Sequence, residues 1–250
     1  MRIGLPSKLK PLRGFSHIVH VGLKFLLPIL AYILVRATFV WPAILLVILS
    51  KWRMFAVRPR YWVANLISNG IDITVAVGLI LLMASTASAW WQLFWVAVYM
   101  GWLVWLKPRY DVLSVAAQAM IGQLLGLAVL YLKFGDARLW ILVSVTWLIA
   151  YLAARHFLTS FEEAYTTLLA HVWGYFGAGL AFILGHWLLF YGSIAQIIVI
   201  MTVVGYGLAA MYYLDATDKL TSLMERQLVV LMCAILLIVL ALSDWSGATI

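Results

Sequence analysis

Long apolar runs follow one another through most of this chain, and only short polar turns separate them. They cover residues 66–85, 89–106, 112–132, 138–154, 165–191, 194–214 and 228–242. A helix needs about 20 apolar residues to cross a bilayer, whereas a spanning strand needs alternating segments of about ten. The runs are continuous, so they predict seven transmembrane helices.

The composition excludes a soluble domain of this size. Hydrophobic residues make up 66% of the 250 and charged residues only 10%, against about 25% charged in soluble domains. The net charge of +8 could indicate a nucleic-acid partner, but the basic residues stand in the gaps between apolar runs, which is typical of membrane proteins. We therefore expect no nucleic-acid partner.

Cys233 is the only cysteine of the chain and stands inside an apolar run. It excludes a disulfide within one chain and a thiolate metal cluster. The sequence contains no P-loop and no dinucleotide-binding glycine motif. We expect no metal, no cofactor and no catalytic residue.

Residues 15–50 allow two interpretations. A single helix through this region would place Arg36 at the centre of the bilayer, where a charge costs at least about 2.5–3.5 kcal/mol. A hairpin turning near Arg36 avoids that cost, and the long stem of Lys24 can reach the surface. The hairpin consists either of two full spans, giving about nine in total, or of a re-entrant pair beside seven spans.

The positive charges orient this bundle. With the N-terminus inside, thirteen lysines and arginines lie on the cytoplasmic side and three on the outside, and such a bias sets orientation over short loops. The inner group is Arg2, Lys8, Lys10, Arg13, Lys51, Arg53, Arg58, Arg60, Lys107, Arg109, Arg155, Lys219 and Arg226, and the outer group is Arg36, Lys133 and Arg138. The sequence predicts an all-α polytopic transmembrane bundle with a basic cytoplasmic segment 1–14, one membrane domain 15–243 and an outer tail 244–250.

Asp72 is the first candidate for a functional site, because ionisable groups inside a membrane are expensive. Asn65, Asn69 and Asp72 are spaced so that one continuous helix would carry them on one face. In that helix Asp72 would be deep enough to bind a cation or relay a proton. If the helix begins near Gly70 instead, Asp72 lies in its first turn, where a carboxylate favours the helix dipole.

Two glutamines inside the 112–132 span are further candidates. Gln118 and Gln123 can line a polar path, or they can form hydrogen bonds between helices. Gly122 and Gly126 form a GxxxG motif in the same span, and Gly174 begins a second row of small residues. Such rows predict close helix packing in lipid.

The segment KWRMFAVRPRYW at residues 51–62 interleaves basic and aromatic residues. Pro59 predicts a break between two helical elements. The segment either anchors the topology at headgroup depth or forms an anionic-lipid site from Arg53, Arg58 and Arg60, open towards Asp72.

Glu162 and Glu163, followed by the FxxxH pattern that ends at His186, resemble the signature of CAAX-type intramembrane proteases. The arginine that should follow the glutamate pair is absent, and no further histidine motif follows. The two parts also lie about 30 Å apart along one expected helix, so they cannot form one site there.

The phrases SKWRMFAVRPRYW, GYFGAGLAFILGHWLLFYGSIAQ and ALSDW resemble an uncharacterised family of multi-pass proteins in small-genome bacteria. This resemblance implies the bacterial plasma membrane, but no activity and no functional residues.

Three functions fit these observations. A small permease-like or lipid-handling bundle, with anionic headgroups as partners at the cytoplasmic face, agrees with the polar residues inside spans. A structural or assembly subunit, with a membrane-protein partner or a second copy, agrees with the small-residue rows and the lack of a soluble domain. An intramembrane enzyme related to CAAX proteases is the remaining alternative.

Overall fold

The computed structural model describes residues 15–185, 190–191 and 194–243, with backbone alone for 15–21, 23, 53 and 190–191. Its elements are α1 (Phe15–Arg36), α2 (Val40–Leu49), η1 (Trp52–Met54), η2 (Pro59–Tyr61), α3 (Trp62–Ser68), α4 (Gly70–Ser85), α5 (Ala89–Gly101), η3 (Trp102–Leu106), α6 (Val112–Phe134), α7 (Leu139–Thr159), α8 (Thr166–Gly185), β1 (Phe190–Tyr191), β2 (Ile194–Ala195), α9 (Gln196–Ala216) and α10 (Ser222–Leu242). The predicted terminal segments 1–14 and 244–250 lie outside the described residues, as does His186.

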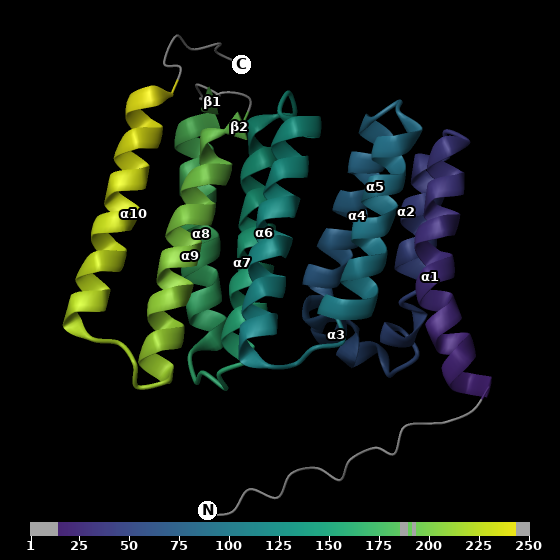
Figure 1. The fold of residues 1–250 in the computed structure, drawn as a ribbon, viewed down its shortest axis with the longest axis horizontal. Helices are drawn as coiled ribbons and strands as arrows, with labels where there is room; N and C mark the ends of the chain where they lie inside the picture. Colours follow the sequence, from purple (N-terminus) through teal and green to yellow (C-terminus); the bar gives the residue numbers. More distant parts are fainter. Residues whose placement is uncertain (1–14, 186–189, 192–193, 244–250) are drawn as a thin grey trace, which may run out of the picture.

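The long helices stand side by side and alternate in direction along the chain (Figure 1). Six of the described helices are long and apolar enough to cross a membrane, and a bent pair of helices brings the number to seven. The two strands hold only two residues each and pair as an antiparallel turn before α9. The prediction of a helical membrane bundle is confirmed at this level, while the number of spans and the placement of the termini stay predictions.

Residues 15–50 form an asymmetric hairpin. α1 ends at Arg36, where a turn had been expected, but α2 contains only 10 residues and is therefore about 15 Å long. Thr38 takes a positive φ of 67° in the turn. Arg36 donates to the carbonyl oxygen of Ala87 at 3.1 Å, which ties the hairpin to the turn between α4 and α5.

The predicted span 66–85 is broken near its start. η2 begins at Pro59, which has no N–H to offer a helix interior, and η2–α3 and α4 meet at an angle of 62°. Asn65 and Asn69 therefore do not share one helix face with Asp72. Asp72 lies in the first turn of α4, as one of the two interpretations expected.

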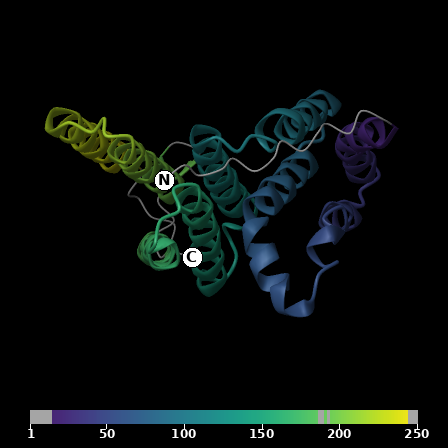
Figure 2. The same cartoon turned by 90° about the horizontal axis from the view of Figure 1, so that it is seen from below.

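The first five helices and the last five meet mainly where α4 packs on α6, as the end-on view also shows (Figure 2). The GxxxG glycines make this approach possible, because a Cβ on Gly122 would lie 2.8 Å from Cγ2 of Ile71 and one on Gly126 would lie 2.7 Å from Cγ2 of Thr74. Gly174 similarly lets α8 approach Trp147 of α7. The predicted close packing at small residues is confirmed.

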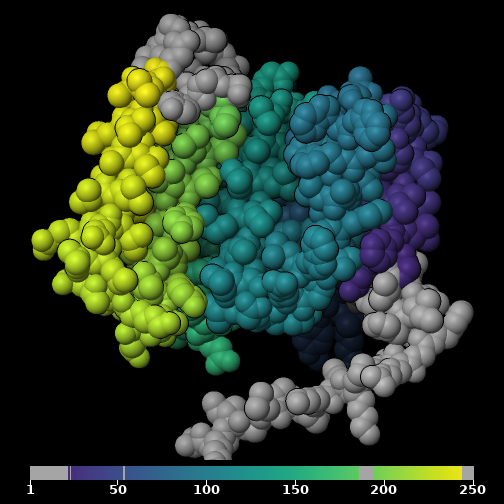
Figure 3. Space-filling model, viewed as in Figure 1, coloured from purple at the N-terminus to yellow at the C-terminus, as the bar shows by residue number. Residues whose placement is uncertain are grey.

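α10 stands at the edge of the molecule, with a long open flank (Figure 3). Only 6% of the residues in its most apolar stretch are buried, and its main neighbour is α9. In a bilayer this flank would face lipid, which solvates leucine and valine side chains as well as a protein core does.

Candidate functional site: a buried carboxylate beneath a lysine-lined cavity

Asp72 is held by three side chains, one from the turn after α2 and two from the turn after α5. The indole Nε1 of Trp102 donates to its Oδ1 at 2.8 Å. Lys107 donates to Oδ2, and the ammonium group of Lys51 forms an ion pair with the same oxygen. The Asp72 residue is only 9% exposed, so these partners replace the water that the carboxylate would otherwise require.

The helical turn after α5 explains how two of these donors reach one carboxylate. Trp102 and Lys107 are five residues apart, and in an α-helix at 3.6 residues per turn they would point about 140° apart. η3 is a π-helical turn, in which Lys107 N–H donates to the carbonyl oxygen of Trp102 at 2.9 Å. Such i→i+5 turns bring residues five apart closer to one face and are frequent at functional sites.

Lys51 lies in the turn after α2, outside the candidate spans, and its side chain is 7% exposed. Burial lowers the pKa of Lys51, and the like charge of Lys107 adds to that shift. The Asp72 carboxylate in contact with Lys51 opposes the shift, since an opposite charge favours the ammonium form. Lys51 is therefore protonated when the charge of a neighbouring anion balances its own.

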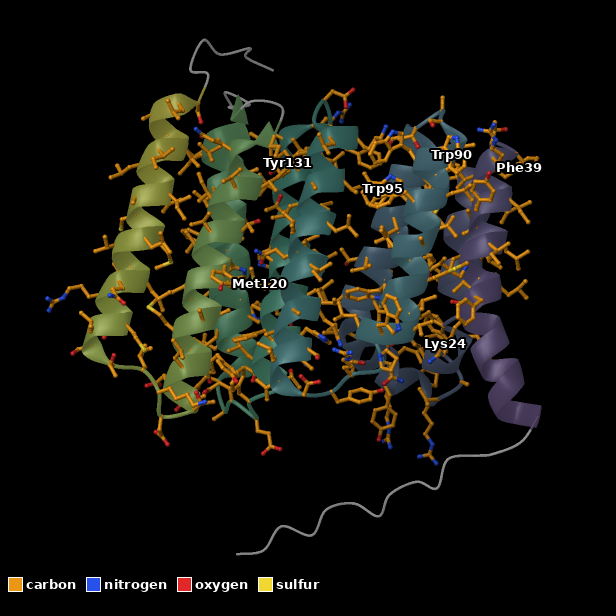
Figure 4. All side chains as sticks on the ribbon, in the orientation of Figure 1. Lys24, Phe39, Trp90, Trp95, Met120 and Tyr131 are labelled. Carbon is orange, nitrogen blue, oxygen red and sulfur yellow. The ribbon has the colours of Figure 1, made fainter. Side chains whose placement is uncertain are left out.

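A cavity of about 660 Å³ opens beside this ion-pair cluster. Lys24, Lys51 and Lys107 supply its basic lining, together with Ser50, Trp52 and Tyr110. Lys24 lies on the part of α1 nearer its beginning, at the bundle end where α3 also lies (Figure 4). The rest of the wall is mainly leucine: Leu26, Leu27, Leu30, Leu46, Leu49 and Leu103. This combination suits an anion that carries an apolar chain.

Gln118 fixes the backbone around Lys107. Its amide nitrogen donates to the carbonyl oxygens of Leu106 at 2.7 Å and Arg109 at 3.0 Å. Its amide oxygen lies 3.0 Å from Nε2 of His156, which acts as the donor because the oxygen of an amide can only accept. Gln118 thereby joins α6, α7 and the turn that carries Lys107.

Gln123 lies at a second, mainly apolar cavity of about 320 Å³ between α6, α7, α8 and α9. Its amide donates to the carbonyl oxygen of Met201 at 3.1 Å, and its oxygen accepts from Nε1 of Trp173 at 2.7 Å. Met120, from the same helix, also lines this cavity (Figure 4). Both glutamines thus bond across helices, and a polar path through them stays a prediction.

The other predicted site residues lie away from the lysine-lined cavity. Asn69 donates to the carbonyl oxygen of Asn65 at 2.9 Å. Arg58 and Arg60 are exposed and do not line the cavity, and Arg60 stacks over the ring of Tyr61. The side chain of Arg53 lies outside the described residues. A lipid site made by these arginines stays a prediction.

Sequence reasoning missed the three lysines as a group. The sequence indicates Lys51 and Lys107 only as charges that set the orientation of the bundle. It indicates Lys24 only as a charge whose burial in the bilayer would be unfavourable. One signal was available: Lys51 and Lys107 stand near ends of expected apolar segments, and Asp72 is the only acidic residue before Asp111. A buried carboxylate needs partners, and these lysines are among the few cations at the same predicted surface.

Glu163 was the acidic member of the protease-like pattern. It accepts a hydrogen bond from the hydroxyl of Tyr212, which lowers the pKa of this half-buried carboxyl group. α8 separates Glu163 from Gly185 by a helix of 20 residues, about 30 Å long. Among the described residues, no three histidine, cysteine, aspartate or glutamate side chains are grouped to hold a metal ion.

Comparisons with known proteins add no constraint on this site. No protein-family model matches the chain, and neither a curated protein nor a solved structure matches it significantly.

Proposed function

We propose that this protein is a lipid-handling membrane protein that binds an anionic amphiphile in the lysine-lined cavity. The supporting observation is the joint lining of that cavity, with three lysines at one part of the wall and leucines over most of the rest. An aqueous permease would need a more polar wall, whereas a lipid needs this division between headgroup and chain.

The leucine wall offers the chain of such a ligand a way out to the bilayer. Leu26 is 46% exposed, Leu30 37% and Leu49 67%, so the α1–α2 side of the cavity borders the apolar surroundings of the bundle. The ligand can therefore place its charged group beside the lysines while its chain remains in lipid.

The orientation predicted from the basic residues puts this cavity at the cytoplasmic leaflet. We place the protein in the plasma membrane of a bacterium, as the resemblance of its sequence phrases implies. Anionic lipids of that leaflet would then be its first source of ligand.

Lipid retention measured by native mass spectrometry tests this proposal. The purified chain, presented with equal amounts of an anionic and a zwitterionic lipid of the same acyl chains, should retain the anionic one. Replacement of Lys24 and Lys107 by glutamine should abolish that preference. The proposal is wrong if the unaltered chain retains both lipids equally.

A matched control removes the same charge from the same end of the bundle. Lys219 and Arg226 stand in and after the turn between α9 and α10, which lies at that end (Figure 1), and neither lines the cavity. Replacing both by glutamine should leave the lipid preference unchanged. A separate Arg58→Gln, Arg60→Gln variant tests the site that the sequence had suggested.

A further inference from the structure

The ligand class can be narrowed from the charges that surround the cavity. Lys24 and Lys107 carry two formal positive charges, and Lys51 adds a third when the Asp72 carboxylate keeps it in its ammonium form against the lowering of its pKa by burial. With the one negative charge of Asp72 the formal net charge is then two. A phosphate monoester carries about −1.5 to −2 at neutral pH, whereas a phosphodiester carries one negative charge. The monoester is the better match in charge.

The hydrogen-bond donors favour the same ligand. Each ammonium group has three donors, and the Asp72 carboxylate accepts one hydrogen bond from Lys107 while it forms an ion pair with Lys51. Two donors of Lys107 therefore remain beside the cavity, and the buried Nζ of Lys51 has no hydrogen-bond acceptor among the described residues. A terminal phosphate presents three acceptor oxygens to them, while a diester headgroup uses one of these oxygens for its second ester bond.

The position of the two lysines also indicates how the phosphate would bind. Both ammonium groups converge on one oxygen of Asp72, which compensates their mutual repulsion. The side chain of Lys107 is 39% exposed and that of Lys51 only 7%. Lys107 can therefore turn towards an incoming phosphate while Lys51 remains paired with Asp72.

The lining offers little to the headgroups of ordinary phosphodiester lipids. Among the described residues that line the cavity there is no carboxylate and no side-chain amide, and Asp72 beside it is already paired with Lys51 and Lys107. The ammonium group of an ethanolamine, serine or choline headgroup would therefore find lysines in place of a free acidic partner. Two positive charges, one on the headgroup and one on a lysine, repel each other at such short range. The cavity thus selects against zwitterionic lipids as well as for a dianion.

We infer that the cavity binds an amphiphile whose headgroup ends in a phosphate monoester, with its chain leaving along the leucines of α1 and α2. This inference rests on the proposed function, because it names the ligand class of the same cavity.

Native mass spectrometry of the full chain, with lipids of identical acyl chains, tests the inference. The probes are phosphatidic acid as the monoester, phosphatidylglycerol as the diester and phosphatidylcholine as the zwitterion. We expect phosphatidic acid to bind at least about tenfold more tightly than phosphatidylglycerol, the gain expected from one more charge-assisted hydrogen bond. The Lys107→Gln variant should bring the two affinities together, and the Lys219→Gln, Arg226→Gln variant should preserve the difference.

The outcomes separate the two proposals. Equal affinities for the monoester and the diester, both above that for phosphatidylcholine, would overturn the inference and leave the proposed function standing. Equal affinities for all three lipids would overturn both. Competition by inorganic phosphate at the same concentrations as phosphatidic acid would show that the ligand is free phosphate, and the amphiphile would be rejected.

Discussion

At the scale of single residues, Asp72 is the group that brings the lysines of the cavity together. The sequence marks it as a costly group inside a membrane segment and leaves its depth open. The structure places it in the first turn of α4 and pairs it with Lys51, Trp102 and Lys107. Lys51 follows α2, whereas Trp102 and Lys107 share the turn after α5, so no pattern local to Asp72 could identify them. Only the packing of α2, α4 and α5 brings them together.

Replacing Asp72 by asparagine removes the negative charge and keeps the shape of the side chain. We expect the free energy of unfolding to fall by about 3 kcal/mol, because a buried ammonium group loses its counter-charge. The phosphate of phosphatidic acid can then replace the Asp72 carboxylate as the anion that balances Lys51 and Lys107, so phosphatidic acid should bind more tightly. Thermal unfolding and native mass spectrometry measure the two effects. Unchanged stability together with unchanged affinity would show that the ion-pair cluster has neither role.

Gln118 is predicted to be a positioning residue for Lys107. Gln118→Leu leaves the carbonyl groups of Leu106 and Arg109 without their donor and should cost about 1–3 kcal/mol of stability. It should also weaken the binding of phosphatidic acid, because the backbone on both sides of Lys107 loses its restraint.

Gln123→Leu provides the matched control for that prediction. Its amide has two partners of its own, so the loss of stability should be similar. It lies at the second cavity, so lipid affinity should not change. If both variants reduce affinity equally, the positioning role of Gln118 is refuted.

At the scale of elements, the sequence predicts the helices well and their irregularities poorly. Hydropathy located the long helices because each must fill the bilayer with apolar side chains. It predicted one helix over residues 66–85, where the structure has a bent pair whose two parts begin at Pro59 and Gly70. The π-helical turn at Trp102–Leu106 has no signature in an apolar run, since it changes which residues face the core and not how hydrophobic they are.

Deleting Val104 from that turn would test what the π-helical geometry does. The deletion leaves Trp102 and Lys107 four residues apart, about 40° in an α-helix, so both donors should still reach Asp72. We expect a folded protein that keeps its affinity for phosphatidic acid, and circular dichroism would verify that the helices remain. A loss of affinity in this folded protein would mean that the extra residue of the π-helical turn is needed to position Lys107.

The α4–α6 contact should be sensitive to side-chain volume. A Cβ on Gly126 would meet Thr74 at 2.7 Å and Ile149 at 3.1 Å, so Gly126→Val should cost about 1–3 kcal/mol through overpacking. Gly179→Val is the control, because nothing lies within 4 Å of its Cβ position. Equal melting temperatures for the two variants would contradict the close approach of these helices.

At the scale of the whole molecule, the orientation of the bundle in the membrane decides which leaflet supplies the ligand. Lys24, Lys51 and Lys107 line a cavity at the end of the bundle where the α9–α10 turn also lies, and the α6–α7 turn lies at the other end (Figure 1). The excess of basic residues predicts that the cavity end is cytoplasmic. The contacts inside the bundle are the same in either orientation, so only the charges decide between the two.

Cysteine labelling in intact cells tests this orientation. In a Cys233→Ala background, Asp136→Cys in the α6–α7 turn should react with a membrane-impermeant maleimide, and Lys219→Cys in the α9–α10 turn should react only after the cells are opened. The reverse pattern would place the cavity in the outer leaflet.

The most direct test of the central claim is an experimental structure of the chain in lipid nanodiscs that contain phosphatidic acid. The account predicts a phosphate within hydrogen-bond reach of Lys51 and Lys107, with the acyl chains leaving along the leucines of α1 and α2. A cavity without lipid under these conditions, or a lipid whose phosphate lies away from both lysines, would contradict it.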